Sequence, residues 1–244
     1  MPEVFASARE AVAAYIAAAV LPAIVLLWYI YKKDKVEREP VVLLLTLLVS
    51  GVIAAAAAVL IERAGSTALD ARISTDHPFY AVIRSFLVIA AVEEGIKLFA
   101  LRRRSWRKKS FNYLYDAVVY SAFVSLGFAA FENVNYVFML GLEVALPRAL
   151  FSVPAHLCFS VFMGVFYGRA KRCALKKDRF GRFSNMLFSF VYPLFLHGLY
   201  DSCALMATDI STLVFVILVL LMYIAAFVII RKTSRNTKPF ASFD

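Results

Sequence analysis

Eight ionisable or hydrogen-bonding side chains lie inside segments that are otherwise apolar. They belong to the motifs EEGIK, FENVNY, PAHLCFSVFMG and HGLYD, and they are Glu93, Glu94, Lys97, Glu132, Tyr136, His156, His197 and Asp201. An ionisable group at membrane depth costs several kcal/mol unless it is paired or faces water, so each is a candidate for function. Carboxylates and imidazoles can activate water, bind an oxyanion or hold a metal ion. Hydrolysis is therefore the first chemistry that this set suggests.

Helical spacing gives most of these groups a neighbour. Lys97 lies four residues after Glu93 and three after Glu94, so one helix face brings its ammonium group to either carboxylate. Ionisation of both adjacent glutamates is disfavoured in a site of low dielectric, so we expect one to keep its proton while Lys97 keeps the other charged. A spacing of four also joins two further pairs, Glu132 with Tyr136 and His197 with Asp201.

The segments that carry the motifs must cross a membrane. Of the 244 residues, 62% are hydrophobic, against about 45–50% in an ordinary soluble protein. An apolar run of about 20 residues spans the hydrocarbon core. We predict about seven such spans, all helical, in a multi-pass protein of the cell membrane, at 10–31, 41–61, 79–101, 114–140, 148–169, 186–206 and 212–230. The first has no basic leader or small-residue cleavage site, which favours an uncleaved helix.

Basic residues predict the orientation of these spans. Most of the 27 lysine and arginine residues fall in alternate connections, after the first, third, fifth and seventh spans. The positive-inside rule makes those connections cytoplasmic, with the N-terminus outside and the C-terminus inside. The net charge of +10 is then explained by topology and anionic lipid headgroups, and no nucleic-acid motif accompanies it. We expect the lipid bilayer as a partner and no nucleic acid.

The motifs are also expected at one depth in the membrane. With a rise of 1.5 Å per residue, Glu94 lies about 15 Å below Arg84 at the outer end of its span. Glu132 and His156 each lie about 12 Å, and His197 about 14 Å, below the outer ends of theirs. Four helices thus bring carboxylates and imidazoles to roughly one layer, where they can form a single site.

The four motifs resemble the pattern of a known family. EEGIK matches EExxK, FENVNY matches FExxxY, His156 and Gly164 match H-x7-G, and HGLYD matches HxxxD. In this order on successive spans they resemble the PrsW family of intramembrane proteases, which is similar to the CAAX prenyl-protein endopeptidases. The resemblance covers residues 93–201 and implies cleavage of a membrane-anchored protein within or beside the membrane, as in the site-1 step of anti-sigma-factor degradation.

The resemblance also implies roles for the residues. Glu93 or Glu94 is the expected catalytic carboxylate, and Glu132, His156 and His197 complete the site. We favour Glu93 as the base, because the first glutamate of the related CAAX motif is implied to activate water. The supporting residues are Lys97, Tyr136 and Asp201.

A metal ion is left open by the sequence. Glu132, His156 and His197 could bind a divalent ion such as zinc and leave a fourth position for water. No HExxH motif is present, and the CAAX branch is described as working with glutamate and histidine alone.

Two other functions fit the same residues. The polar groups could relay protons or ions in a transporter, or the chain could be an inactive scaffold that binds partner helices. Glu93, Glu94 and Lys97 could also be a structural ion pair. We favour the endopeptidase, with residues 1–244 as one domain, 79–206 as the motif core, and the first, second and seventh spans as scaffold.

Overall fold

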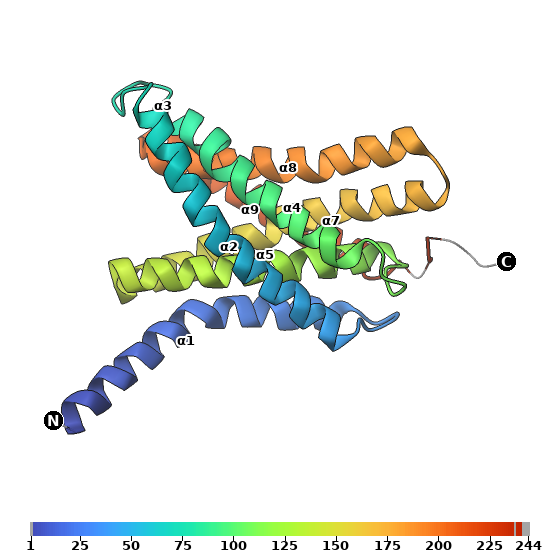
Figure 1. The fold of residues 1–244 in the computed structure, drawn as a ribbon, viewed down its shortest axis with the longest axis horizontal. Helices are drawn as coiled ribbons and strands as arrows, with labels where there is room; N and C mark the ends of the chain where they lie inside the picture. Colours follow the sequence, from blue (N-terminus) through green and yellow to red (C-terminus); the bar gives the residue numbers. More distant parts are fainter. Residues whose placement is uncertain (1, 237, 241–244) are drawn as a thin grey trace.

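The structure, a computed structural model, describes residues 2–236 and 238–240 and is helical throughout that part of the chain, with no strand in it. The long helices are joined by short loops and by brief 3-10, π-helical and α-helical segments (Figure 1). The elements in order are α1 (Pro2–Lys33), α2 (Val41–Asp70), α3 (Tyr80–Ile83), η1 (Arg84–Ala90), α4 (Ala91–Ser105), α5 (Leu114–Leu140), η2 (Leu142–Val144), α6 (Ala145–Pro147), η3 (Arg148–Ser152), α7 (Val153–Leu175), α8 (Arg179–Met206) and α9 (Asp209–Thr233).

Five helical segments are long and apolar enough to cross a membrane, so this is a multi-pass membrane protein. They are Arg9–Lys33, Val41–Asp70, Leu114–Leu140, Leu142–Leu175 and Asp209–Thr233. The other two predicted spans, 79–101 and 186–206, are helical as well, in α3–η1–α4 and in α8. These two are more polar and carry the EEGIK and HGLYD motifs.

The second helix is longer than the sequence predicts. The predicted span ends at residue 61 because Glu62 and Arg63 interrupt the apolar run, whereas α2 continues to Asp70. A charged residue does not end a helix when its side chain finds a suitable environment. In Figure 1, α2 and α4 run obliquely across α5, and a tilted helix needs more residues to cross the same thickness.

The core lies around α5 and α7. In the most apolar stretch of α5, 83% of the residues are buried, against 22% in α9, so α9 lies at the periphery. Small residues let the backbones approach: a Cβ on Gly127 would clash with the carbonyl of Leu48 in α2, and one on Gly164 would clash with Ser121. Small residues are the usual means of close helix contact in membranes.

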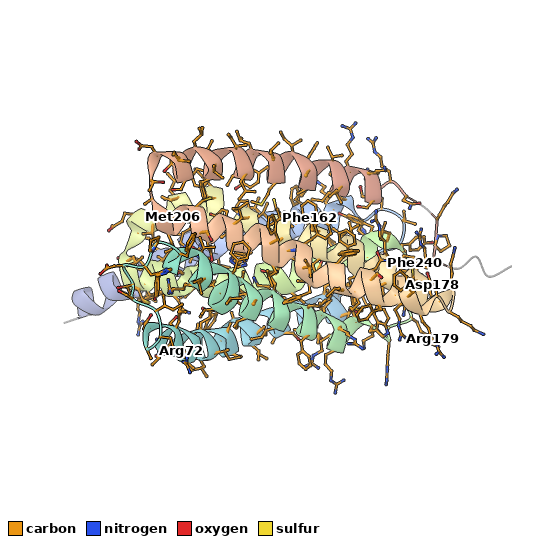
Figure 2. All side chains as sticks on the ribbon, turned by 90° about the horizontal axis from the view of Figure 1, so that it is seen from above. Arg72, Phe162, Asp178, Arg179, Met206 and Phe240 are labelled. Carbon is orange, nitrogen blue, oxygen red and sulfur yellow. The ribbon has the colours of Figure 1, made fainter. Side chains whose placement is uncertain are left out.

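The loops separate to the two ends of the bundle. Figure 2 shows Arg72 and Met206 at one end, and Asp178, Arg179 and Phe240 at the other. The second end includes a residue of the C-terminal tail: Phe240 is buried against Phe111, with ring centroids 5.7 Å apart.

Candidate active site

The ammonium group of Lys97 lies at the centre of the site. Its Nζ donates hydrogen bonds to Glu93 Oε2 and Glu94 Oε1, both at 2.8 Å, and lies 3.2 Å from His156 Nδ1. All four side chains are buried, and Lys97 and Glu94 are 0% exposed. The spacing within EEGIK places the three charged groups on one face of α4, as the sequence predicts. A lysine has three N–H donors, so this arrangement uses all of them.

Glu94 connects this centre to α8. His197 Nδ1 lies 2.9 Å from Glu94 Oε1, and His197 Nε2 lies 3.3 Å from Asp201 Oδ2. Both ring nitrogens therefore face carboxylates, which favours the doubly protonated imidazolium, because only that form has two donors. The predicted pair of His197 with Asp201 is present in the structure.

His156 connects the same centre to α5. Its Nε2 lies 2.9 Å from Glu132 Oε2. Since the ammonium group of Lys97 has no acceptor, His156 Nδ1 must accept from it, and Nε2 then carries the proton and donates to Glu132. The hydrogen-bond partners thus determine which ring nitrogen of His156 carries the proton. Ser125 holds the backbone of this segment by donating to the carbonyl of His156 at 2.9 Å.

Glu132 has a second partner in Arg148, at the start of η3. Arg148 Nη2 lies 3.2 Å from Glu132 Oε1, but no hydrogen bond forms from this nitrogen. Arg148 Nε donates to Asn133 Oδ1 at 2.7 Å, and Asn133 donates to the carbonyl of Ala19 in α1 at 2.7 Å. A chain of polar contacts therefore runs from the site to α1.

Aromatic rings enclose the polar groups. The ring of Phe159 stacks on His197 with centroids 4.7 Å apart, and Lys97 Nζ lies 4.1 Å from the centre of the Phe128 ring. Tyr136 lies under the guanidinium of Arg148 at 3.9 Å, and no hydrogen bond joins its hydroxyl to Glu132 among the described residues. Tyr136 thus supports Glu132 through Arg148, whereas the sequence suggests direct contact.

All eight residues singled out by their types and spacing therefore gather in one region, on α4, α5, α7 and α8. A family model described as PrsW family intramembrane metalloprotease matches residues 39–230. The chain belongs to the PrsW family.

Relatives in the PrsW family cover most of the chain. The Protease PrsW of Geobacillus kaustophilus is 36% identical over 186 residues, which are 76% of this chain and 77% of the relative. The Protease PrsW of Oceanobacillus iheyensis is 32% identical over 91% of this chain and 97% of its own length. That of Bacillus subtilis is 34% identical over 77% of this chain and 81% of its own. No solved structure matches the chain.

PrsW membership confirms the predicted intramembrane endopeptidase, and nothing in these likenesses points to a transporter. The family description as a metalloprotease raises the question of a metal ion. Among the described residues, the ligand atoms that lie within 4.8 Å of one another are those of Glu93, Glu94 and His156. This set shares only His156 with the predicted ligands Glu132, His156 and His197.

Two carboxylates and an imidazole are suitable ligands for zinc, with a fourth position for water. The same three side chains also surround the ammonium group of Lys97 in this PrsW protein. The donor set thus fits a divalent ion by type, and such an ion would take the place of the Lys97 ammonium group.

Three features of this PrsW site are absent from the sequence prediction. Arg148 is the first residue of a predicted span, and spacing within one helix does not give its distance from Glu132 on another. Asn133 lies within FENVNY, and its position at membrane depth was the only available signal. Glu62 lies one residue beyond the predicted second span, which ends at residue 61.

Proposed function

We propose that this PrsW-family protease cleaves a membrane-anchored protein by means of a water molecule that Glu93 activates. The observation that carries this proposal is the unequal use of the two Glu93 oxygens. Oε2 accepts from Lys97, while Oε1 has no hydrogen bond among the described residues. Glu93 is thus fixed in place with one oxygen left to take a proton from water, which is the geometry a general base needs.

The reaction then follows the usual course of amide hydrolysis. As the water oxygen bonds to the scissile carbonyl carbon, its proton passes to Glu93 Oε1. When the C–N bond breaks, this proton passes to the leaving amine, so that the carboxylate is restored. Lys97 and Arg148 supply fixed positive charge beside the negative charge that develops on the carbonyl oxygen.

The remaining residues hold this arrangement. Glu94 anchors Lys97 and His197, and Asp201 fixes the other nitrogen of His197. His156 and Glu132 form the second branch, with Arg148 and Tyr136 behind Glu132. If a zinc ion binds, Glu93, Glu94 and His156 would hold it, and it would supply an acidified water and a Lewis acid.

The membrane arrangement is part of the proposal. We place seven spans in the bilayer, with the N-terminus outside and the C-terminus in the cytoplasm, and treat residues 1–244 as one domain with its motif core at 79–206. The structure supports this by gathering the predicted cytoplasmic segments, marked by Asp178 and Phe240, at one end of the bundle (Figure 2).

The test is cleavage in liposomes. A panel of single-span membrane proteins is reconstituted together with the wild-type protein or with Glu93→Gln, and fragments are detected by mass spectrometry. We expect wild type to cleave at least one substrate within or beside its span, and the folded Glu93→Gln variant to cleave none. Equal cleavage by both would exclude Glu93 as the base, and no cleavage by wild type would count against the substrate class.

A second arm addresses the metal ion. Zinc content of the purified protein is measured by mass spectrometry, and cleavage is repeated with a chelator and after zinc is restored. Loss and recovery with a stoichiometric ion would show that cleavage depends on a bound metal, and absence of that ion from Glu94→Gln would support a site made by Glu93, Glu94 and His156. Unchanged cleavage in the chelator would show that Lys97 is the cation of the working site.

A further inference from the structure

Glu62 lies on the face of α2 that packs into the bundle. Leu47, Gly51, Ala55 and Ala58 are buried at helical spacing along this face, and Glu62 follows Ala58 by one turn. Three residues later, Gly65 faces Val88 of η1, which a Cβ on that glycine would approach to 3.0 Å. Glu62 is therefore held between two packed contacts within a membrane-spanning helix.

The neighbours of Glu62 adjoin the active site. Ala58 belongs to a cluster that also includes Val92 and Phe131, and these residues directly precede Glu93 and Glu132. Glu62 therefore lies one turn beyond the part of α2 that packs against the residues preceding Glu93 and Glu132. This helix belongs to the predicted scaffold, yet its packed face adjoins the helices that carry the proposed catalytic groups.

One oxygen of Glu62 has no partner. Oε1 is enclosed and accepts no hydrogen bond, and no ion pair joins Glu62 to a lysine or arginine among the described residues. Glu93, Glu94 and Glu132 each contact a cation or an imidazole. An unpaired acceptor in a membrane span costs free energy. The Glu62 carboxylate therefore destabilises the free protein, and a hydrogen-bond donor that binds to it lowers the free energy.

A peptide undergoing cleavage in a membrane brings such donors. Within an α-helix the backbone N–H groups are bonded to the helix itself, and the helix must open for a base and a water to reach the scissile carbonyl. In a medium without water the freed N–H groups need new acceptors. An enclosed carboxylate oxygen on the helix face that adjoins the site matches this requirement in both chemistry and place.

We propose that Glu62 forms a subsite for the unwound backbone of the substrate, in which its carboxylate accepts a hydrogen bond from a peptide N–H close to the scissile bond. This inference rests on the proposed function and adds a specificity to it. The subsite favours substrates whose helix opens readily at the cleavage point, because Glu62 binds the opened backbone and not a particular side chain.

Two variants at Glu62 distinguish a substrate-binding role from a purely structural one. Glu62→Gln keeps an acceptor oxygen of the same shape without charge, and Glu62→Leu has similar volume and no acceptor. Arg63→Leu is the matched control, since Arg63 is the next residue and lies on the exposed side of α2. Each is assayed with the substrate from the panel that wild type cleaves fastest, and the melting temperature is measured alongside.

We expect Glu62→Leu to raise KM about tenfold, the effect of one hydrogen bond to a charged group, with kcat within about twofold of wild type. Glu62→Gln keeps a neutral acceptor oxygen and should raise KM by only about threefold, whereas Arg63→Leu should leave KM within about twofold of wild type. The melting temperature of Glu62→Leu should equal or exceed that of wild type, because an unpaired buried carboxylate has been removed. A residue that serves only the fold would show the reverse, a lower melting temperature and an unchanged KM.

Modified substrates identify the backbone N–H group that donates to Glu62. Synthetic substrates carry single amide-to-ester replacements around the scissile bond, each of which removes one N–H. We expect one replacement that raises KM for wild type and has no further effect on Glu62→Leu. The inference is overturned if Glu62→Leu binds and cleaves like wild type, if Glu62→Gln loses kcat as Glu93→Gln does, or if no ester position depends on Glu62. Activity of wild type and its loss in Glu93→Gln keep the proposed function separate from these outcomes.

Discussion

Buried and half-buried carboxylates gather in two clusters of the part of the chain that the structure describes, and the partners of the two clusters differ. In the active site, Glu93 and Glu94 share Lys97, and Glu132 faces Arg148 and His156. The second group, here called the loop cluster, lies where the α1–α2 loop meets the start of α5, and consists of Asp34, Glu39 and Asp116.

The loop cluster has hydroxyl and amide partners in place of cations. Glu39 accepts a hydrogen bond from Tyr120. Asp116 accepts from the backbone N–H groups of Asn112 and Tyr113 at 2.8 and 2.6 Å and so caps α5. One oxygen each of Asp34 and Glu39 is enclosed without a partner.

The two clusters differ in the partners of their carboxylates and not in burial alone. In the candidate active site, cations or imidazoles contact the carboxylates, and a positive neighbour in general favours the charged form, in which a carboxylate can take up a proton during a reaction. In the loop cluster, burial raises the pKa of Glu39 to about 7 and that of Asp34 to about 6, so their titration moves towards neutral pH. Buried acids are therefore candidates for catalysis here only where a cation accompanies them.

The largest difference between the two groups is expected in activity. Glu94→Gln removes the charge that anchors Lys97 and His197, and should lower kcat by about 100-fold or more. Glu39→Gln makes the same isosteric change at a buried acid of the loop cluster and should stay within about twofold of wild type. Initial rates of fragment release in liposomes measure both, and equal losses in the two variants would remove the distinction.

Removal of the central cation should make the active site resemble the loop cluster. Lys97→Met leaves Glu93 and Glu94 buried without their partner, which typically costs about 3–5 kcal/mol. Denaturant unfolding in detergent at neutral pH measures this loss. Addition of Glu94→Gln to Lys97→Met should recover part of it, and a Lys97→Met protein as stable as wild type would mean that the ion pair is not needed.

The loop cluster should respond to pH. The folded state binds a proton at Glu39 more tightly than the unfolded state, whose carboxyl has a pKa near 4.5. Stability from this group is thus complete below about pH 4.5 and is lost as pH rises through about 7, a decrease of about 2 kcal/mol between pH 5 and 7. Thermal unfolding across this range should show it, with a smaller slope in Glu39→Gln; stability that rises with pH would contradict the assignment.

The smallest effect is expected at the edge of the active site. Arg148→Lys keeps the charge near Glu132 but loses the Nε contact with Asn133 and the flat stack on Tyr136. We expect kcat/KM to fall about tenfold, the scale of a residue that positions another. Arg169→Lys is the control, because Arg169 is exposed and lies over Phe166, outside the site. This variant should leave kcat/KM unchanged. A similar fall in both variants would point to a general effect of arginine removal.

Much of this site could be read from the sequence because its motifs are local. The spacing in EEGIK fixes the contacts of Lys97 within one helix turn, and HGLYD fixes His197 beside Asp201. Long-range partners could not be read in this way. The contacts of His156 with Lys97 and of Arg148 with Glu132 depend on how α4, α5 and α7 cross, which spacing within a helix does not encode.

The limits of the fold prediction have a similar cause. The predicted segment 114–140 coincides with α5, whose apolar character is continuous. The segment around Glu62 was cut short because hydropathy cannot distinguish a charged residue that ends a helix from one that faces a polar site. The same averaging makes α4 and α8 look less apolar than the other spans, since the residues proposed for chemistry are the polar ones.

Lys97 also offers a means of observing the site at work. It is the one buried lysine among the described residues, so amine-labelling reagents should modify the other lysines and spare it while the bundle is closed. If a substrate or a curved bilayer separates α4 from α7 and α8, the ammonium group of Lys97 loses its acceptors and becomes reactive. The labelling rate of a single side chain would then report how often this protease opens.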